Sequence, residues 1–153
     1  TTPEGIRLCM SPVREIERIR GKRHAWTDLL LVPGQNPLAS LEGELWDIEA
    51  QVEPDESADV VLNIRGEQVR YDAKAKTLHA LGRSAPLEPL AGRLSLRVLV
   101  DRTSIEVFAG DGLVTLCSCF LPDLADRSLG LYVKSGRATV KSLSVCELRP
   151  AWQ

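Results

Sequence analysis

Residues 94–112 read LSLRVLVDRTSIEVFAGDG, and this stretch decides the fold. Apolar residues recur at every second position on both sides of the central Asp-Arg-Thr-Ser segment: Leu94, Leu96, Val98, Val100, then Ile105 and Val107. A period of two is typical of a strand with one buried face. Gly110-Asp111-Gly112 supplies the positive φ angles that a hairpin needs. The stretch therefore predicts two consecutive strands followed by a hairpin turn.

The same alternation recurs along most of the chain. In residues 44–53 the apolar and polar side chains separate onto opposite faces. Further strand patterns follow between turn signals, at residues 60–64, 69–71, 114–121, 129–134 and 138–148. Only residues 13–20 have helical spacing, whereas a parallel α/β sheet needs a helix between most strands. The sequence therefore predicts an all-β fold, a two-sheet antiparallel β-sandwich of jelly-roll or concanavalin-like type with one short N-terminal helix.

The predicted elements divide the chain into three parts. Residues 1–22 form a connecting segment with the short helix, residues 23–150 form the β-sandwich, and residues 151–153 form a tail. A chain of 153 residues has the usual length of one domain and can bury its own core. Because the chain begins with Thr1 and no signal-peptide pattern follows, we expect it to be a piece of a longer protein.

The composition argues against several classes of partner. Hydrophobic residues make up 44% and charged residues 26%, which is ordinary for a soluble folded protein. A net charge of -2 gives no electrostatic reason to expect a nucleic acid or an anionic membrane. Apolar runs such as Leu29–Val32 are far shorter than the ~20 residues of a spanning helix. Since no phosphate loop or dinucleotide fingerprint is present either, we expect no nucleic acid, no membrane and no cofactor.

Four cysteines raise the question of a metal or disulfide site: Cys9, Cys117, Cys119 and Cys146. Cys117 and Cys119 lie two apart on a predicted strand and so point to the same face. A structural zinc site usually takes a second ligand pair, and the remaining cysteines and both histidines stand alone. We therefore expect no metal site and interpret the cysteines as buried, reduced thiols. Without an evident pairing pattern they favour a cytoplasmic parent, with secretion as the alternative.

Catalytic constellations are weak in this sequence. A glycosidase needs two carboxyl groups about 5–9 Å apart, and among 21 acidic residues only Asp101 and Glu106 have a suggestive setting. They stand five residues apart around a bend, but the simpler interpretation is a turn at Asp101 and a paired acid at Glu106. No Gly-x-Ser-x-Gly nucleophile elbow is present. The sequence therefore predicts no catalytic residue.

The hallmark segment, residues 96–112, closely resembles the C-terminal module of family 32 glycoside hydrolases, the invertase, levanase and inulinase group. That module carries a hydrophobic strand, Asp-Arg-Ser-Ser, Val-Glu-Val-Phe and an Asn-Asp-Gly type turn. Residues 128–132 and 138–143 match its next strands, and residues 12–20 resemble the segment that enters the sandwich from the catalytic propeller. Two departures stand out: Arg83 lacks the acid that often precedes it, and Cys146 replaces a frequent tryptophan.

The resemblance implies a non-catalytic module whose partner is the catalytic β-propeller of the same parent chain. The family's catalytic motifs, an Asn-Asp-Pro-Asn type motif, an Arg-Asp-Pro motif and a Glu-Cys motif, do not occur in this sequence. The module would stabilise or pack on that propeller, and whether the parent cleaves sucrose, levan or inulin would depend on the propeller. An exposed apolar patch is expected under this hypothesis.

The alternative hypothesis is a carbohydrate-binding module that recognises the terminal fructose of an oligosaccharide or polysaccharide. It predicts a compact polar pocket formed by four residues: Arg83, Asp101, Arg102 and Glu106. Carboxylates and arginines can hold neighbouring sugar hydroxyls through charge-assisted hydrogen bonds. A third hypothesis, an independent enzyme, requires an exposed and closely spaced pair of carboxyl groups.

Overall fold

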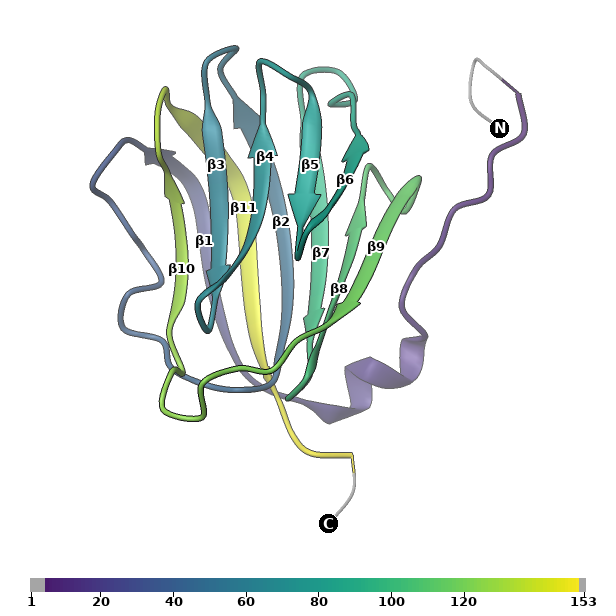
Figure 1. Ribbon diagram of the computed structural model, residues 1–153, viewed down its shortest axis with the longest axis vertical. Coiled ribbons are helices and arrows are strands. Elements are labelled where there is room, and N and C mark those ends of the chain that lie inside the picture. Colours follow the sequence, from purple (N-terminus) through teal and green to yellow (C-terminus); the bar gives the residue numbers. More distant parts are fainter. Residues whose placement is uncertain (1–4, 152–153) are drawn as a thin grey trace.

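A computed structural model describes residues 5–151 as a sandwich of two antiparallel sheets (Figure 1). The six-stranded sheet has the order β1 (Arg20–Leu31), β11 (Ala138–Leu148), β2 (Trp46–Pro54), β7 (Leu94–Val100), β8 (Ser104–Ala109), β9 (Val114–Cys119). The five-stranded sheet has the order β10 (Leu129–Val133), β3 (Asp59–Ile64), β4 (Glu67–Asp72), β5 (Thr77–Ala80), β6 (Arg83–Pro86). The predicted fold class is confirmed.

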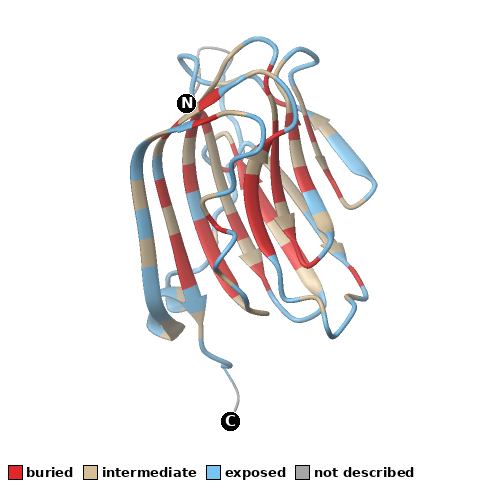
Figure 2. Ribbon diagram, turned by 90° about the vertical axis from the view of Figure 1, so that its left-hand side faces the viewer, coloured by how far each residue is buried: buried red, intermediate tan, exposed pale blue. Residues whose placement is uncertain are grey.

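The core lies between the two sheets, on the faces that the alternation predicts. Figure 2 shows the buried residues along the strands, interrupted by exposed ones. In β2, Trp46, Ile48 and Val52 are at most 2% exposed, and β7 and β8 contribute further buried aliphatic side chains. Burial of each such side chain favours folding by roughly 1.5–3 kcal/mol. The hydrophobic alternation therefore fixes which face of each strand turns inward.

The predicted short N-terminal helix is present within residues 13–20. It is a 3₁₀ helix, η1 (Arg14–Ile19), and contains no buried residue. Of its apolar residues, Val13 is 64% exposed, whereas Ile16 and Ile19 are half-buried. A 3₁₀ helix rarely extends beyond a few residues. β1 begins directly after it, at Arg20, and pairs there with Leu148.

An extended segment, residues 5–13, precedes η1 and runs beside the β8–β9 hairpin (Figure 1). The Met10 N–H donates a 3.0 Å hydrogen bond to the Gly112 carbonyl. Gly112 has φ +86°, and a Cβ atom there would lie 2.0 Å from the Met10 carbonyl oxygen. Only glycine fits this contact. The hairpin tip predicted from the sequence thus also anchors the approach to the sandwich.

Within residues 5–151, the structure contains no helix with the length and apolar character needed to cross a membrane.

We expect the core to behave as one cooperative unit, and two leucines give a matched test. Leu78 is fully buried and Leu90 is 74% exposed. Leu78→Ala should lower the free energy of unfolding by about 2–5 kcal/mol, since it removes buried methyl groups and leaves a cavity. Leu90→Ala should change it by less than about 0.5 kcal/mol. Urea unfolding of both variants measures the difference, and equal losses would contradict the described core.

Candidate functional site

The turn of the hallmark segment, between β7 and β8, is closed by its own polar groups. The Asp101 N–H donates to the Ser104 carbonyl at 2.9 Å, and the Asp101 carboxylate accepts the Arg102 N–H at 2.8 Å. Both side chains are exposed. The Arg102 guanidinium meets Glu44 at 3.6 Å. The turn interpretation of Asp101 therefore agrees with the geometry.

Arg65, which the sequence analysis did not single out, holds this turn from the opposite sheet. It is 4% exposed, and its Nε and Nη1 atoms donate to the carbonyls of Asp126 and Arg102 at 3.0 and 3.2 Å. Its guanidinium carbon lies 6.0 Å from the centre of the Phe120 ring, within the range of a cation–π contact. The only sequence signal was its position before Gly66, which predicts a turn but not burial.

Arg83 and Glu106 approach one side chain, Cys117, from different elements. Glu106 on β8 lies opposite Cys117 on β9, and Arg83 comes from β6 at the adjoining edge. Burial raises the pKa of the Cys117 thiol, the charges of Glu106 and Cys119 raise it further, and Arg83 opposes the shift. Asp101 lies instead in the β7–β8 turn. The carbohydrate-binding role of Arg83, Asp101, Arg102 and Glu106 stays a prediction.

The prediction of four buried thiols was wrong for three of them. Cys146 is 3% exposed, but Cys9, Cys117 and Cys119 are exposed, and all four are free. β9 is an edge strand, and the face that carries Cys117 and Cys119 points away from the core. The alternating sequence of β9 predicts a strand, but it cannot show that no other element packs on the outward face of that strand. Within the described residues, no group of three His, Cys, Asp or Glu side chains is placed to hold a metal ion.

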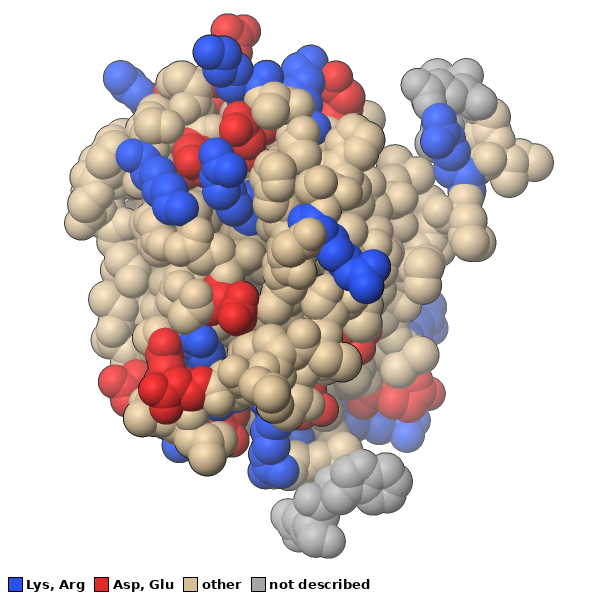
Figure 3. Space-filling view, in the orientation of Figure 1, with Lys and Arg blue, Asp and Glu red and all other residues tan. Residues whose placement is uncertain are grey.

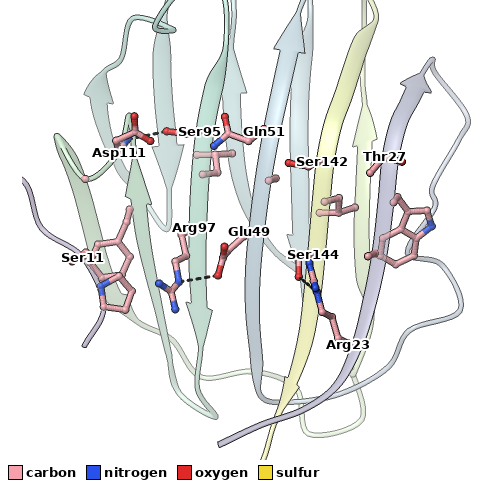
Figure 4. Close-up of a pocket in the computed structure, with 18 of the residues that line it drawn as sticks. Ser11, Arg23, Thr27, Glu49, Gln51, Ser95, Arg97, Asp111, Ser142 and Ser144 are labelled. Atoms are coloured by element: carbon pink, nitrogen blue, oxygen red, sulfur yellow. Dashed lines mark hydrogen bonds and ion pairs between the residues drawn. The ribbon is translucent and has the colours of Figure 1, made fainter. Parts of the chain in front are cut away.

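The outer face of the six-stranded sheet carries a cavity of about 410 Å³ lined by both polar and apolar side chains (Figure 4). Ser11 lies at one rim and Thr27 at the other. Most of its polar lining comes from four strands (β1, β2, β7 and β11) and the β8–β9 turn: Arg23, Glu49, Gln51, Ser95, Arg97, Asp111, Ser142 and Ser144. The Arg23 Nε donates to the Ser144 hydroxyl at 2.8 Å. The alternation predicts a polar outer face, and the strand order gathers its side chains into one concavity.

Asp47 is the buried centre of the charge network beside this cavity. Its side chain is fully buried and accepts two 3.0 Å hydrogen bonds from Arg97 and one of 2.8 Å from Arg20. Arg20 also bonds to Glu49. Burial alone would lower the pKa of Arg20, but the hydrogen bonds and charges of Asp47 and Glu49 outweigh it and raise that pKa. A fully buried carboxylate is tolerable because both oxygens are paired with guanidinium groups.

The arrangement of Asp47 and Glu49 favours a role in holding the sheet together over a role in hydrolysis. A glycosidase uses one carboxyl group as an acid and a second as base or nucleophile across the scissile bond. Asp47 and Glu49 instead direct their oxygens to Arg20 on β1 and Arg97 on β7, two other strands of the same sheet. Charge-assisted hydrogen bonds of this kind fix the register of the strands that carry them.

The face of the five-stranded sheet mixes both signs of charge (Figure 3). Arg70 pairs with Asp59 at 2.6 Å and with Asp72 at 3.2 Å. Interspersed charges of this kind create no extended field of one sign.

We expect Asp47→Asn to destabilise the sandwich by about 3 kcal/mol, because it leaves two arginines without their shared buried carboxylate. Glu49→Gln is the matched control: the Glu49 side chain is 47% exposed, so its loss should cost at most about 1 kcal/mol. Chemical denaturation measures both. If Asp47→Asn unfolds no more easily than Glu49→Gln, the network does not support the fold.

Comparison with known proteins places the chain in a family. Residues 15–147 match the family described as Glycosyl hydrolases family 32 C terminal. The chain is 34% identical to the levanase of Bacillus subtilis (strain 168), over 97% of this chain and 26% of that protein. It is 31% identical to the raffinose invertase of Escherichia coli, over 86% of this chain and 30% of that protein. It therefore spans between about a quarter and a third of the length of these relatives.

Solved structures share the fold at low sequence identity. The exo-inulinase of Aspergillus awamori superposes with a TM-score of 0.78 at 19% identity, over 99% of this chain and 34% of that one. Fructan 1-exohydrolase IIa of Cichorium intybus gives a TM-score of 0.71 at 13% identity, over 94% of this chain and 38% of that one. Together with the family match over residues 15–147, they show that the chain belongs to glycosyl hydrolase family 32, as the C-terminal β-sandwich module.

Proposed function

We propose that this chain is a non-catalytic module that packs on the catalytic propeller of a fructan- or sucrose-hydrolysing enzyme and stabilises it. The observation that carries the proposal is the exposed apolar side of residues 5–13. Ile6 is 94% exposed, Leu8 86% and Met10 52%, and they occupy alternate positions of an extended segment. Alternate positions of extended backbone face the same side. These three exposed side chains are called the apolar stripe below; Met10, the least exposed of them, also borders the cavity on the outer face of the six-stranded sheet.

An exposed apolar stripe on a folded domain marks a contact surface, because burying it is favourable. The backbone hydrogen bond between Met10 and Gly112 fixes the C-terminal end of the stripe to the β8–β9 turn of the sandwich. It lies immediately before residues 12–20, the segment that resembles the entry from the propeller. The named relatives are three to four times longer than their matched part, which leaves room for a catalytic domain. These observations favour the propeller as the domain that packs on the apolar stripe.

Two features support a non-catalytic role. The carboxylates of Asp47 and Glu49 are engaged by arginines, and Asp101 closes a turn with its own backbone neighbour. The catalytic motifs of the family do not occur in the 153 residues. Hydrolysis would then be a property of the longer chain, to which this module contributes stability.

The proposal predicts that replacing the stripe residues leaves the stability of the isolated module unchanged. The same replacement should destabilise a chain in which the module is joined to its propeller. Ile6→Ser combined with Leu8→Ser should change the unfolding free energy of the isolated module by less than about 0.5 kcal/mol, because both residues are solvated. In a chain that joins the module to its propeller, each buried side chain should contribute roughly 1.5–3 kcal/mol. The readouts are urea unfolding of the module and the temperature at which the joined enzyme loses activity.

Leu90→Ser is the matched control, because Leu90 is as exposed as the stripe but lies between β6 and β7. It should leave both the module and the joined enzyme unchanged. If the double variant has the same inactivation temperature as the parent enzyme, the stripe is not the packing surface.

A second prediction separates the module from the carbohydrate-binding alternative. Calorimetric titration of the module with fructose, levan and inulin should give no saturable heat, and the module should release no sugar from levan or sucrose. Saturable heat that disappears in Glu106→Ala would support the binding alternative instead. Since Glu106 lies on the outer face of β8, the variant should fold normally, which circular dichroism verifies.

A further inference from the structure

Two exposed thiols stand together at the end of an edge strand. Cys117 and Cys119 belong to β9, which pairs with β8 and forms one edge of the six-stranded sheet. Their side chains leave the same face of the strand, since they are two residues apart. Cys117 lies opposite Glu106, and Cys119 lies opposite Ser104. Neither thiol contributes to the core, whereas Cys146 is buried, so packing does not account for them.

The spacing of the two thiols suits a bridging ion better than a disulfide. Equivalent atoms two residues apart on a strand are about 6.6 Å apart, whereas a disulfide needs Cβ atoms about 3.5–4.5 Å apart. Direct bonding would therefore distort the end of β9. Two sulfurs that share one ion, each at about 2.3 Å, stand up to about 4.6 Å apart. The side chains then need only lean toward each other.

We propose that Cys117 and Cys119 form a two-thiolate site for a thiophilic monovalent ion, Cu(I). Soft thiolate ligands select Cu(I) over harder ions. Zn(II) takes four ligands, and the described residues offer no cluster of three candidate ligands. Cu(I) accepts two thiolates in a linear arrangement and needs no further protein ligand. This site belongs to the module alone and does not depend on the proposed packing on a propeller.

Binding is balanced by the release of protons. Two thiols and one Cu(I) give a dithiolate complex of net charge −1 and two protons, so affinity rises with pH. The charges that act on Cys117 come from three elements: Glu106 on β8, Arg83 on β6 and Cys119 on β9 itself. Arg83 favours the thiolate and Glu106 disfavours it.

The test is anaerobic titration of the reduced 153-residue chain with Cu(I), in competition with the chromogenic chelator bicinchoninate. We expect one Cu(I) per chain. Cys117→Ser and Cys119→Ser should each weaken binding by more than about 100-fold, beyond the 10–100-fold typical of losing a neighbouring outer-shell group. Cys9→Ser, which removes an exposed thiol elsewhere, should leave the affinity unchanged. Glu106→Gln should tighten binding and Arg83→Gln should weaken it.

Three results would overturn the site. The first is a loss of affinity in Cys9→Ser equal to that in Cys117→Ser. The second is a copper-bridged dimer, seen as binding that depends on protein concentration and as a doubled mass in size-exclusion chromatography. The third is rapid formation of a Cys117–Cys119 disulfide on exposure to glutathione disulfide, seen as a loss of two hydrogens by mass spectrometry. All the substituted side chains lie on the surface, and circular dichroism confirms that each variant is folded.

Discussion

One guanidinium group, that of Arg65, joins the two sheets at one end of the sandwich. Arg65 lies in the turn between β3 and β4 of the five-stranded sheet, and its side chain reaches the β7–β8 turn of the six-stranded sheet. The same side chain holds the connection from β9 to β10 through the Asp126 carbonyl. A buried guanidinium without partners would cost several kcal/mol. The loops therefore have to stay where they satisfy it, and this constraint helps to fix the position of the hallmark turn.

Asp47 plays the corresponding part on the outer face of the six-stranded sheet. Arg20 and Arg97 reach it from β1 and β7, while β2 carries the carboxylate between them. β11 lies between β1 and β2, so the Arg20 contact spans a whole strand. Such a network adds directional contacts to a sheet whose other cohesion is non-directional burial. Two residues that line the adjacent cavity, Glu49 and Arg97, are held in position by this network.

The sequence predicts the fold well because the decisive signal is local. Alternation in residues 94–107 states which side chains turn inward, and the structure places Leu94, Val98, Val100 and Val107 there. It predicts the networks poorly because they depend on strand order. Alternation places Asp47 on the outer face correctly, but its burial follows from arginines 27 and 50 residues away. Cys117 is exposed for the same reason: a local pattern does not reveal that β9 lies at an edge.

The two polar networks and the apolar stripe lead to different expectations about partners. Arg65 and Asp47 are satisfied inside the module, so neither needs another domain to offset its burial. The stripe at Ile6, Leu8 and Met10 has the opposite character: its hydrogen bond to the sandwich is made by backbone, while its side chains meet water. Folding of the sandwich thus leaves apolar side chains at the stripe whose burial would still release free energy. The association proposed for that surface would draw on the same hydrophobic term that forms the core.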